Sequence, residues 1–140
     1  MNKIKYRFFV DKECNWFQDG KAITHKGIYN FNYKHLKINK DKVFFVQEEK
    51  SIAYVDFEDK PFLVRIADVS EKKTVLLLND STKEELDVSS LYFKNNIPYC
   101  SVKQGVFEAR FSRPALYQIS KIIKITDGKY YIGSCLINHQ

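Results

Sequence analysis

Two arginines close together are the residues best suited to chemistry in this sequence. Arg110 and Arg113 are two of only four arginines among 23 basic residues. Where lysine is the usual solvating cation, paired guanidinium groups favour two-point contact with a carboxylate or phosphate. Glu108 shares a face of the expected strand with Arg110, because alternate strand residues point the same way. This spacing predicts a site for a small anion.

The helix expected after this strand adds to the same site. Ser112 is a good N-cap, and Pro114 is tolerated in a first turn. Free backbone N–H groups and the helix dipole favour negative charge at a helix N-terminus. We therefore expect Arg113 to lie where an anion is already attracted.

A structural interpretation of the arginines stays open beside the functional one. Arg110 or Arg113 can pair with Glu58 or Asp59, which precede a proline in a rigid turn. Such an ion pair would hold the two halves of the chain together and could also open to a ligand. In the plainest interpretation, the remaining basic residues only solvate the protein.

Nothing in the sequence predicts catalysis or a bound metal. The histidines and cysteines have no spacing that suits a metal ion; they are His25, His35, His139, Cys14, Cys100 and Cys135. There is no His-Glu-x-x-His, Cys-x-x-Cys, Gly-x-Ser-x-Gly or glycine-rich phosphate motif. We expect reduced thiols, no cofactor and no enzyme activity.

The aromatic content of 15% gives an alternative function, the binding of single-stranded nucleic acid. Bases stack on exposed aromatic rings in a basic groove. The candidates are Trp16, Phe17, Tyr29, Phe31, Tyr33 and Tyr117. The same residues fall at the spacing of a hydrophobic core, and a small chain must bury most of its aromatic residues to be stable.

The elements that position these residues form two similar series. In the first, a strand at 6–10 precedes a hairpin turned by Asp19-Gly20. Thr24 is expected to cap a helix that ends near residues 39–41, and residues 42–47 form a strand.

The second series repeats this order near the end of the chain. A hairpin around Gly105 joins strands at 99–102 and 106–111, and Ser112 begins a helix that ends at Thr126-Asp127-Gly128. A strand at 129–132 follows. Hairpin, helix and strand thus occur twice, which predicts an internal duplication of residues 15–47 in residues 98–133.

Between the two series, four strands with short polar turns predict an antiparallel meander. The expected strands are 51–57, 62–69, 74–78 and 84–88. The expected fold class is α+β, with an N-terminal unit at 1–50 and a second unit at 51–140 that contains the meander.

Composition and charge describe a small globular protein. The 140 residues are 44% hydrophobic and 29% charged, with a net charge of +6. Residues 21–42 carry six lysines against one aspartate, whereas residues 43–92 carry eleven acidic groups against six basic ones. No apolar run approaches the roughly 20 residues that cross a bilayer, and residues 1–11 lack a signal-peptide core. We expect a cytoplasmic protein that does not attach to a membrane.

Three stretches are similar to a bacterial family known as domain of unknown function 1285. Residues 57–62, Phe-Glu-Asp-Lys-Pro-Phe, resemble its "ED-x-PF" turn, and residues 108–117 resemble its "EAR-x-x-RP-x-x-Y" stretch. Residues 16–23 resemble its "W-x-x-G-x-P-I" hairpin. The resemblance covers roughly residues 8 to 132. The chain departs from it at Ala22, where the family has proline, and in a shorter tail after residue 132.

The resemblance implies a duplicated fold whose C-terminal half is superficially like a pleckstrin-homology sheet and helix. It also implies a small-ligand site between the halves, for a nucleotide-like molecule, and a role in signalling. No catalytic activity is established for the family. The expected ligand-binding residues are Arg110, Arg113, Asp59, Glu108, Trp16 and Tyr117. We therefore predict a regulatory module that binds a small anionic molecule.

Overall fold

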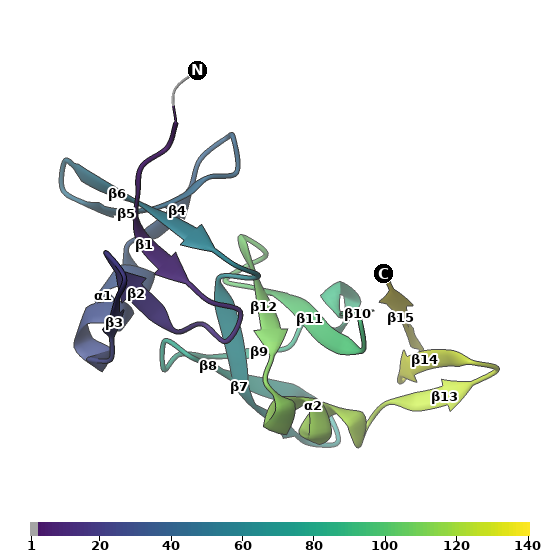
Figure 1. The fold of residues 1–140 in the computed structure, drawn as a ribbon. Helices are drawn as coiled ribbons and strands as arrows, with labels where there is room; N and C mark the ends of the chain where they lie inside the picture. The colour runs from purple at the N-terminus through teal and green to yellow at the C-terminus, as the bar shows by residue number, and fades with distance from the viewer. Residues whose placement is uncertain (1–2) are drawn as a thin grey trace. The chain divides into compact units, whose positions relative to one another are not determined.

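The computed structural model describes residues 3–140 and divides the chain into two compact units, Met1–Asp59 and Lys60–Gln140 (Figure 1). The fold is α+β, as the sequence predicts. The sequence-based boundary at residue 50 lies before β6 (Ser51–Phe57). Because β6 pairs with two other strands of residues 1–59, it belongs to the first unit.

The first unit is built on a six-stranded sheet in the order β3-β2-β1-β6-β5-β4. The other strands are β1 (Tyr6–Val10), β2 (Trp16–Gln18), β3 (Lys21–Ile23), β4 (Leu36–Ile38) and β5 (Phe44–Glu48). Adjacent strands are antiparallel except β1 and β6, which run parallel. Asp19-Gly20 turns the β2–β3 hairpin as predicted, and both residues have the positive φ that a two-residue turn of this kind requires.

Helix α1 (Lys26–Lys34) is shorter than the sequence suggested. Its N-cap is His25, whose Nδ1 accepts a hydrogen bond from the Gly27 N–H at 3.1 Å, so the expected cap at Thr24 is one residue early. The helix does not continue to residues 39–41, because Leu36–Ile38 pairs with β5 as strand β4. Burial of Leu36 in that pairing outweighs the helical spacing.

The core of the first unit forms around Trp16, which is 2% exposed. Its ring makes edge-to-face contacts with Phe8, Tyr33 and Phe57, at centroid distances of 5.6, 5.1 and 5.8 Å. Tyr33 is on α1, so these contacts fix the helix on the sheet.

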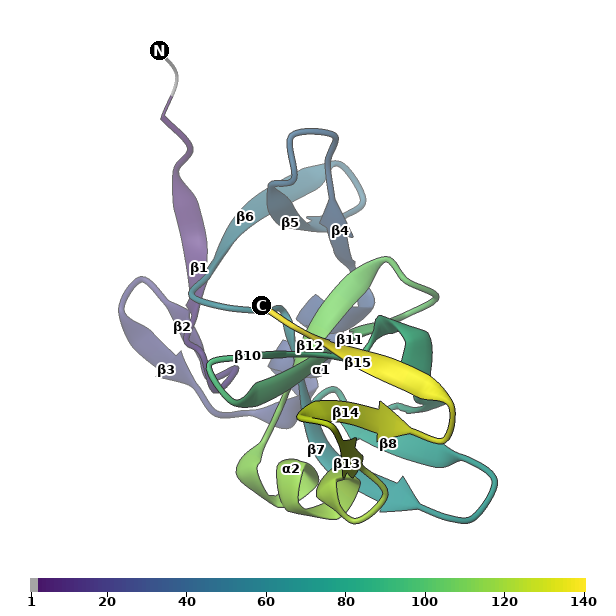
Figure 2. The same cartoon turned by 90° about the vertical axis from the view of Figure 1, so that its right-hand side faces the viewer.

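The second unit contains a nine-stranded sheet in the order β13-β14-β15-β10-β11-β12-β7-β8-β9. Its strands are β7 (Phe62–Val69), β8 (Thr74–Leu78), β9 (Lys83–Glu85), β10 (Tyr92–Lys94), β11 (Ile97–Val102), β12 (Phe107–Phe111), β13 (Lys124–Thr126), β14 (Lys129–Ile132) and β15 (Cys135–His139), with a 3-10 turn η1 (Val88–Ser90) before β10. Two neighbouring pairs are parallel, β10 with β15 and β12 with β7. Figure 2 shows β15 between β10 and β14.

The expected meander is present as β7, β8 and β9, which pair antiparallel in sequence. It begins at residue 62 and not at 51, because residues 51–57 form β6 in the other sheet. The meander also joins the β11–β12 hairpin through the parallel pairing of β7 and β12.

Helix α2 (Arg113–Ser120) begins as predicted. The Ser112 hydroxyl accepts a hydrogen bond from the Ala115 N–H at 3.3 Å, and Pro114 lies in the first turn. Ala115 and Ile119 are fully buried on the face of α2 that packs on β7. The helix ends at Ser120 and not at the expected Thr126-Asp127-Gly128, since residues 124–126 form β13 and Asp127-Gly128 turns the β13–β14 hairpin.

Six strands of the second sheet have the same order and directions as the six strands of the first. The order β12-β11-β10-β15-β14-β13 corresponds to β3-β2-β1-β6-β5-β4. In both sets the central pair is parallel and all other pairs are antiparallel. A helix follows the corresponding strand in both sets, α1 after β3 and α2 after β12.

Candidate functional site

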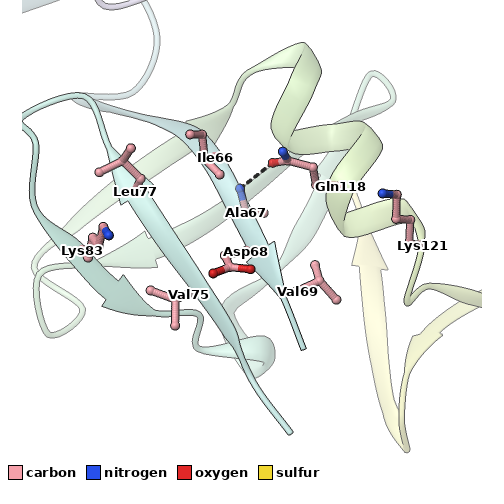
Figure 3. A pocket seen from close by; sticks show the side chains of 9 residues that line it. All are labelled: Ile66, Ala67, Asp68, Val69, Val75, Leu77, Lys83, Gln118 and Lys121. Carbon is pink, nitrogen blue, oxygen red and sulfur yellow. Dashed lines mark hydrogen bonds between the residues drawn. The ribbon is translucent and has the colours of Figure 1, made fainter. Parts of the chain in front are cut away.

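The second unit has a cavity of about 400 Å³, here called the β7 pocket, beside the strand from which it takes its name. Its lining residues come from the β7–β8–β9 meander, from α2 and from Lys121, the C-cap of that helix. They are Ile66, Ala67, Asp68, Val69, Val75, Leu77, Lys83, Gln118 and Lys121 (Figure 3).

A β-bulge in β7 shapes the floor of this pocket. Val64 pairs with Leu78, but Ile66 pairs with Leu77, so Arg65 is an extra residue on the β7 side. A bulge of this kind re-aims the side chains that follow it. As a result, buried Val64 faces the core, while exposed Ile66 shares the other face with its partner Leu77.

The same register brings a carboxylate and a lysine to the floor. Asp68 pairs with Val75, and Leu77 pairs with Lys83 of β9. Paired residues on neighbouring strands lie on the same face of a sheet. Figure 3 shows the Asp68 carboxylate between Val75 and Val69, with Lys83 on the side away from the helix.

Helix α2 forms the other wall of the pocket. The Ala67 N–H donates a 2.7 Å hydrogen bond to Oε1 of Gln118, and Lys121 follows one helical turn later. Beyond Val64, β7 is no longer paired with β12, because the chain turns into α2 after Phe111. The side chains of Gln118 and Ser112 therefore form hydrogen bonds with the backbone of β7 at these residues. The Ser112 hydroxyl donates to the Arg65 carbonyl at 3.1 Å.

The charges around the β7 pocket favour an anion with an apolar body. Lys83 and Lys121 are exposed cations, and Asp68 is the one carboxylate that lines the cavity. Within residues 3–140, the structure has no ion pair between any of these three residues. Ile66, Val75 and Leu77 offer apolar surface between them.

Glu108, one of the predicted site residues, is engaged within its own unit. Its carboxylate accepts hydrogen bonds from Lys60 Nζ at 2.9 Å and from the Tyr92 hydroxyl at 2.7 Å. Burial alone would raise the pKa of Glu108, but these two hydrogen bonds and the charge of Lys60 hold it below its ordinary value. Glu108 is therefore a negative charge in a defined position, and its role toward a ligand stays a prediction.

The two arginines lie where the sequence placed them, one on β12 and one on α2. Arg110 is half-buried and lies between Tyr99 of β11 and Leu63 of β7 in the register. Arg113 is exposed at the first position of α2. Glu58 and Asp59 are the last two residues of the first unit, so an ion pair of either one with Arg110 or Arg113 stays a prediction.

The two aromatic residues predicted to contact the ligand, Trp16 and Tyr117, differ in exposure. Trp16 is in the core of the first unit, and its Nε1 is buried without a hydrogen-bond partner. Tyr117 is 63% exposed on α2. Of the rings considered for nucleic-acid stacking, Tyr33 is also buried, whereas Phe31 is exposed and contacts His35. Burial gives Trp16 and Tyr33 a structural role, and their binding roles stay predictions.

None of the six residues predicted from the sequence lines the β7 pocket. Sequence reasoning missed its polar groups, Asp68, Lys83, Gln118 and Lys121. The strands expected at 62–69 and 74–78 are present, but the sequence did not show that a helix would stand beside their outer face. The two lysines have the same sequence signal as any solvating lysine.

The described residues hold no group of three or more histidine, cysteine or acidic side chains that could bind a metal ion. Burial raises the pKa of the Cys100 thiol well above its ordinary value, and the carboxylates of Glu84, Asp87 and Glu108 raise it further. This thiol stays protonated at neutral pH and is a poor nucleophile. Neither helix in residues 3–140 has the length and apolar character needed to span a bilayer.

Two solved structures are similar to this chain, while no family model and no curated protein matches it. One is a DUF1285 family protein from Silicibacter pomeroyi DSS-3, with a TM-score of 0.79 and 15% identity over 94% of this chain and 78% of that one. The other is a DUF1285 family protein from Shewanella baltica OS155, with a TM-score of 0.71 and 14% identity over 83% of this chain and 91% of that one. The resemblance seen in the sequence motifs is confirmed at the level of structure, and this chain has the fold of DUF1285 family proteins.

Proposed function

We propose that this chain is a non-catalytic cytoplasmic module that binds a small anionic molecule and serves a regulatory or signalling role. The observation that carries the proposal is the β7 pocket, where two lysines and one aspartate surround an apolar floor. A nucleotide-like molecule has the matching parts: a flat apolar ring, hydroxyl groups and a phosphate. The ring would lie on Ile66 and Leu77, and a hydroxyl would donate to Asp68.

The lysines set the preference for an anion. An ammonium group is a compact, mobile charge that binds phosphate from several directions, so Lys83 and Lys121 need no fixed geometry. The lining residues carry two cations against one carboxylate, while Glu85, the partner of Val75 on β9, lies on the same face outside the lining. The open apolar floor contributes by removing the ring of the ligand from water.

The proposal also includes the predicted anion site at Arg110 and Arg113 as a competing location. Its support is the half-buried position of Arg110 and the start of α2 at Arg113. The two locations use different side chains, so substitutions can separate them.

We further propose that the two matched sets of strands arose by internal duplication. The support is the identical order and direction of six strands and the matching place of the helix in each set. We also propose that the second unit is similar to the sheet and helix of a pleckstrin-homology domain.

The proposal is tested by a thermal-shift screen of the full chain against nucleotides, sugar phosphates and inorganic phosphate. A ligand present at a hundred times its dissociation constant stabilises the folded state by about 2.7 kcal/mol. The variant Lys83→Gln/Lys121→Gln should lose that shift, and Lys124→Gln/Lys129→Gln is the matched control on exposed strands. Equal shifts in both variants, or no shift with any compound, would contradict the proposal.

A further inference from the structure

The first unit also has a cavity, which lies on the face of its sheet where aromatic side chains are exposed. It has a volume of about 460 Å³. Its lining residues, here called the Phe9 face, are Tyr6, Arg7, Phe8, Phe9, Phe17, Asp19, Gly20 and Asp56. The set joins aromatic rings with two carboxylates, which differs in kind from the β7 pocket.

A β-bulge in β1 gathers the aromatic rings on this face. Tyr6 pairs with Tyr54 and Phe8 pairs with Val55, so Arg7 is an extra residue on the β1 side. The bulge places Tyr6 on the same face as Phe9, although strict alternation would separate them. The exposures agree: Tyr6 and Phe9 are 44% and 40% exposed, while Phe8 and Val10 are buried.

Phe9 lies between a ring and a carboxylate in the register of the sheet. It pairs with Phe17 of β2 on one side and with Asp56 of β6 on the other. The Phe9 and Phe17 rings are tilted, with centroids 6.2 Å apart. An aromatic surface therefore ends directly at a carboxylate.

The second carboxylate is held at a rigid turn. Asp19 and Gly20 both have positive φ in the β2–β3 hairpin, and the Asp19 N–H donates to the Arg7 carbonyl at 3.4 Å. Within residues 3–140, the structure has no hydrogen bond or ion pair to the carboxylate of Asp19 or Asp56. Arg7 supplies one positive charge against these two.

We propose that the Phe9 face binds an organic cation, an ammonium or guanidinium group with apolar substituents. A cation is attracted to the faces of aromatic rings, and a carboxylate beside the rings adds a countercharge. The apolar substituents lie on Tyr6, Phe9 and Phe17. A phosphate backbone does not suit this face, because it would meet both Asp19 and Asp56.

Two sources can present this chemistry, a free small cation or an arginine or lysine side chain of a partner protein. The test is a titration of the full chain followed by ¹H–¹⁵N nuclear magnetic resonance. The probes are choline for the free cation, Nα-acetyl-arginine methylamide for the protein side chain, and 3,3-dimethylbutan-1-ol as the uncharged analogue of choline. Oligo(dT) is the probe for single-stranded nucleic acid.

At least one cation should shift the amide signals of residues 6–9, 17–20 and 56 in a saturable manner. The uncharged analogue should bind about fivefold more weakly, because it lacks the attraction of a charge to the rings. Asp56→Asn and Phe9→Leu should each weaken cation binding about two- to fivefold at this exposed site. Asp41→Asn, in an exposed turn outside the cavity, is the matched control and should change nothing.

The response to choline or to the arginine probe identifies the source, and either supports the proposal. Phe9→Leu removes a partly exposed ring and could unfold the first unit. In that case Asp56→Asn still tests the proposal, because Asp56 is exposed and its substitution leaves the packing unchanged. The proposal is overturned if no cation gives saturable shifts up to about 50 mM, a range that reaches very weak dissociation constants. Equal binding of the uncharged analogue, or binding of oligo(dT) at these residues in place of the cations, also overturns it.

Discussion

The backbone N–H of Ala67 donates a 2.7 Å hydrogen bond to the side-chain oxygen of Gln118, and this bond joins α2 to the part of β7 that pairs with β8 but no longer with β12. Ala67 is 2% exposed, so no other hydrogen-bond partner would replace Gln118 easily. The contact forms part of one wall of the β7 pocket, beside the packing of Ala115 and Ile119 on the same strand.

The first prediction concerns this hydrogen bond. Gln118→Ala should lower the free energy of unfolding of the second unit by about 1–3 kcal/mol, the cost of a buried N–H without an acceptor. Gln118→Glu keeps an acceptor oxygen and should retain most of the stability. Urea denaturation measures both, with Gln18→Ala at the exposed end of β2 as the control. Equal midpoints for all three variants would show that the bond contributes nothing.

The second prediction concerns the pH dependence of Glu108. Its pKa is below the ordinary value of 4.5, because hydrogen bonds from Lys60 and Tyr92 outweigh the effect of burial. The folded state therefore binds the proton less tightly than the unfolded state. The stability that this charge adds is fully present above pH 4.5 and is lost as the pH falls through the lower pKa of the folded state.

Urea unfolding of the wild type and of Glu108→Gln between pH 7 and pH 2.5 measures this contribution. The difference in unfolding free energy should be largest near neutral pH and should shrink in acid. Asp127→Asn, in an exposed turn, is the control. A difference that stays constant, or grows in acid, would contradict the assigned pKa direction.

The third prediction concerns Lys103, whose Nζ donates to Asp80 Oδ2 and to the Thr82 hydroxyl, both at 2.8 Å. The Asp80 side chain is 8% exposed, and Lys103 also lies 5.3 Å from the ring centroid of Phe62. Lys103→Met would leave that carboxylate without its cation. We expect a loss of about 2 kcal/mol in unfolding free energy, below the cost for a fully buried pair because Lys103 is partly exposed.

A double-mutant cycle identifies the source of that loss. Asp80→Asn combined with Lys103→Met should recover part of the stability, because no charge is then left unpaired. Lys94→Met, on an exposed position of β10, is the control. If the loss in the double variant equals the sum of the losses in Lys103→Met and Asp80→Asn, the coupling energy is zero and the ion pair has no role in stability.

Local signals in the sequence predicted some of the turns and caps, although the Thr24 cap and the end of the second helix were misplaced. Asp19-Gly20 and Ser112 with Pro114 act through their own backbone geometry, so they work without knowledge of the rest of the fold. The strands that were missed depend on distant partners. β15 pairs in parallel with β10, with Asn138 beside Tyr92, and nothing in the short segment around Asn138 indicates that partner.

The site was harder to predict than the fold for a similar reason. The bulges at Arg7 and Arg65 become visible only when the pairing of β1 with β6 and of β7 with β8 is known. Each bulge decides which side chains share a face and therefore which residues line a cavity. The motif around Arg110 was noticed because arginines are rare in this chain and two of them are close together. Lys83 and Lys121 could not be told apart from the many other lysines of the sequence.

The central claim, that the β7 pocket binds a small anionic molecule, is tested most directly by a ¹H–¹⁵N nuclear magnetic resonance titration of the full chain with adenosine 5′-monophosphate. Adenosine and inorganic phosphate serve as its two separate parts. We predict saturable shifts of the amide signals of residues 66–69, 75–77 and 118–121, weaker shifts with either part alone, and loss of the shifts in Lys83→Gln/Lys121→Gln. Shifts confined to residues 108–113, or no shifts in the pocket at any concentration of the nucleotide, would contradict the claim.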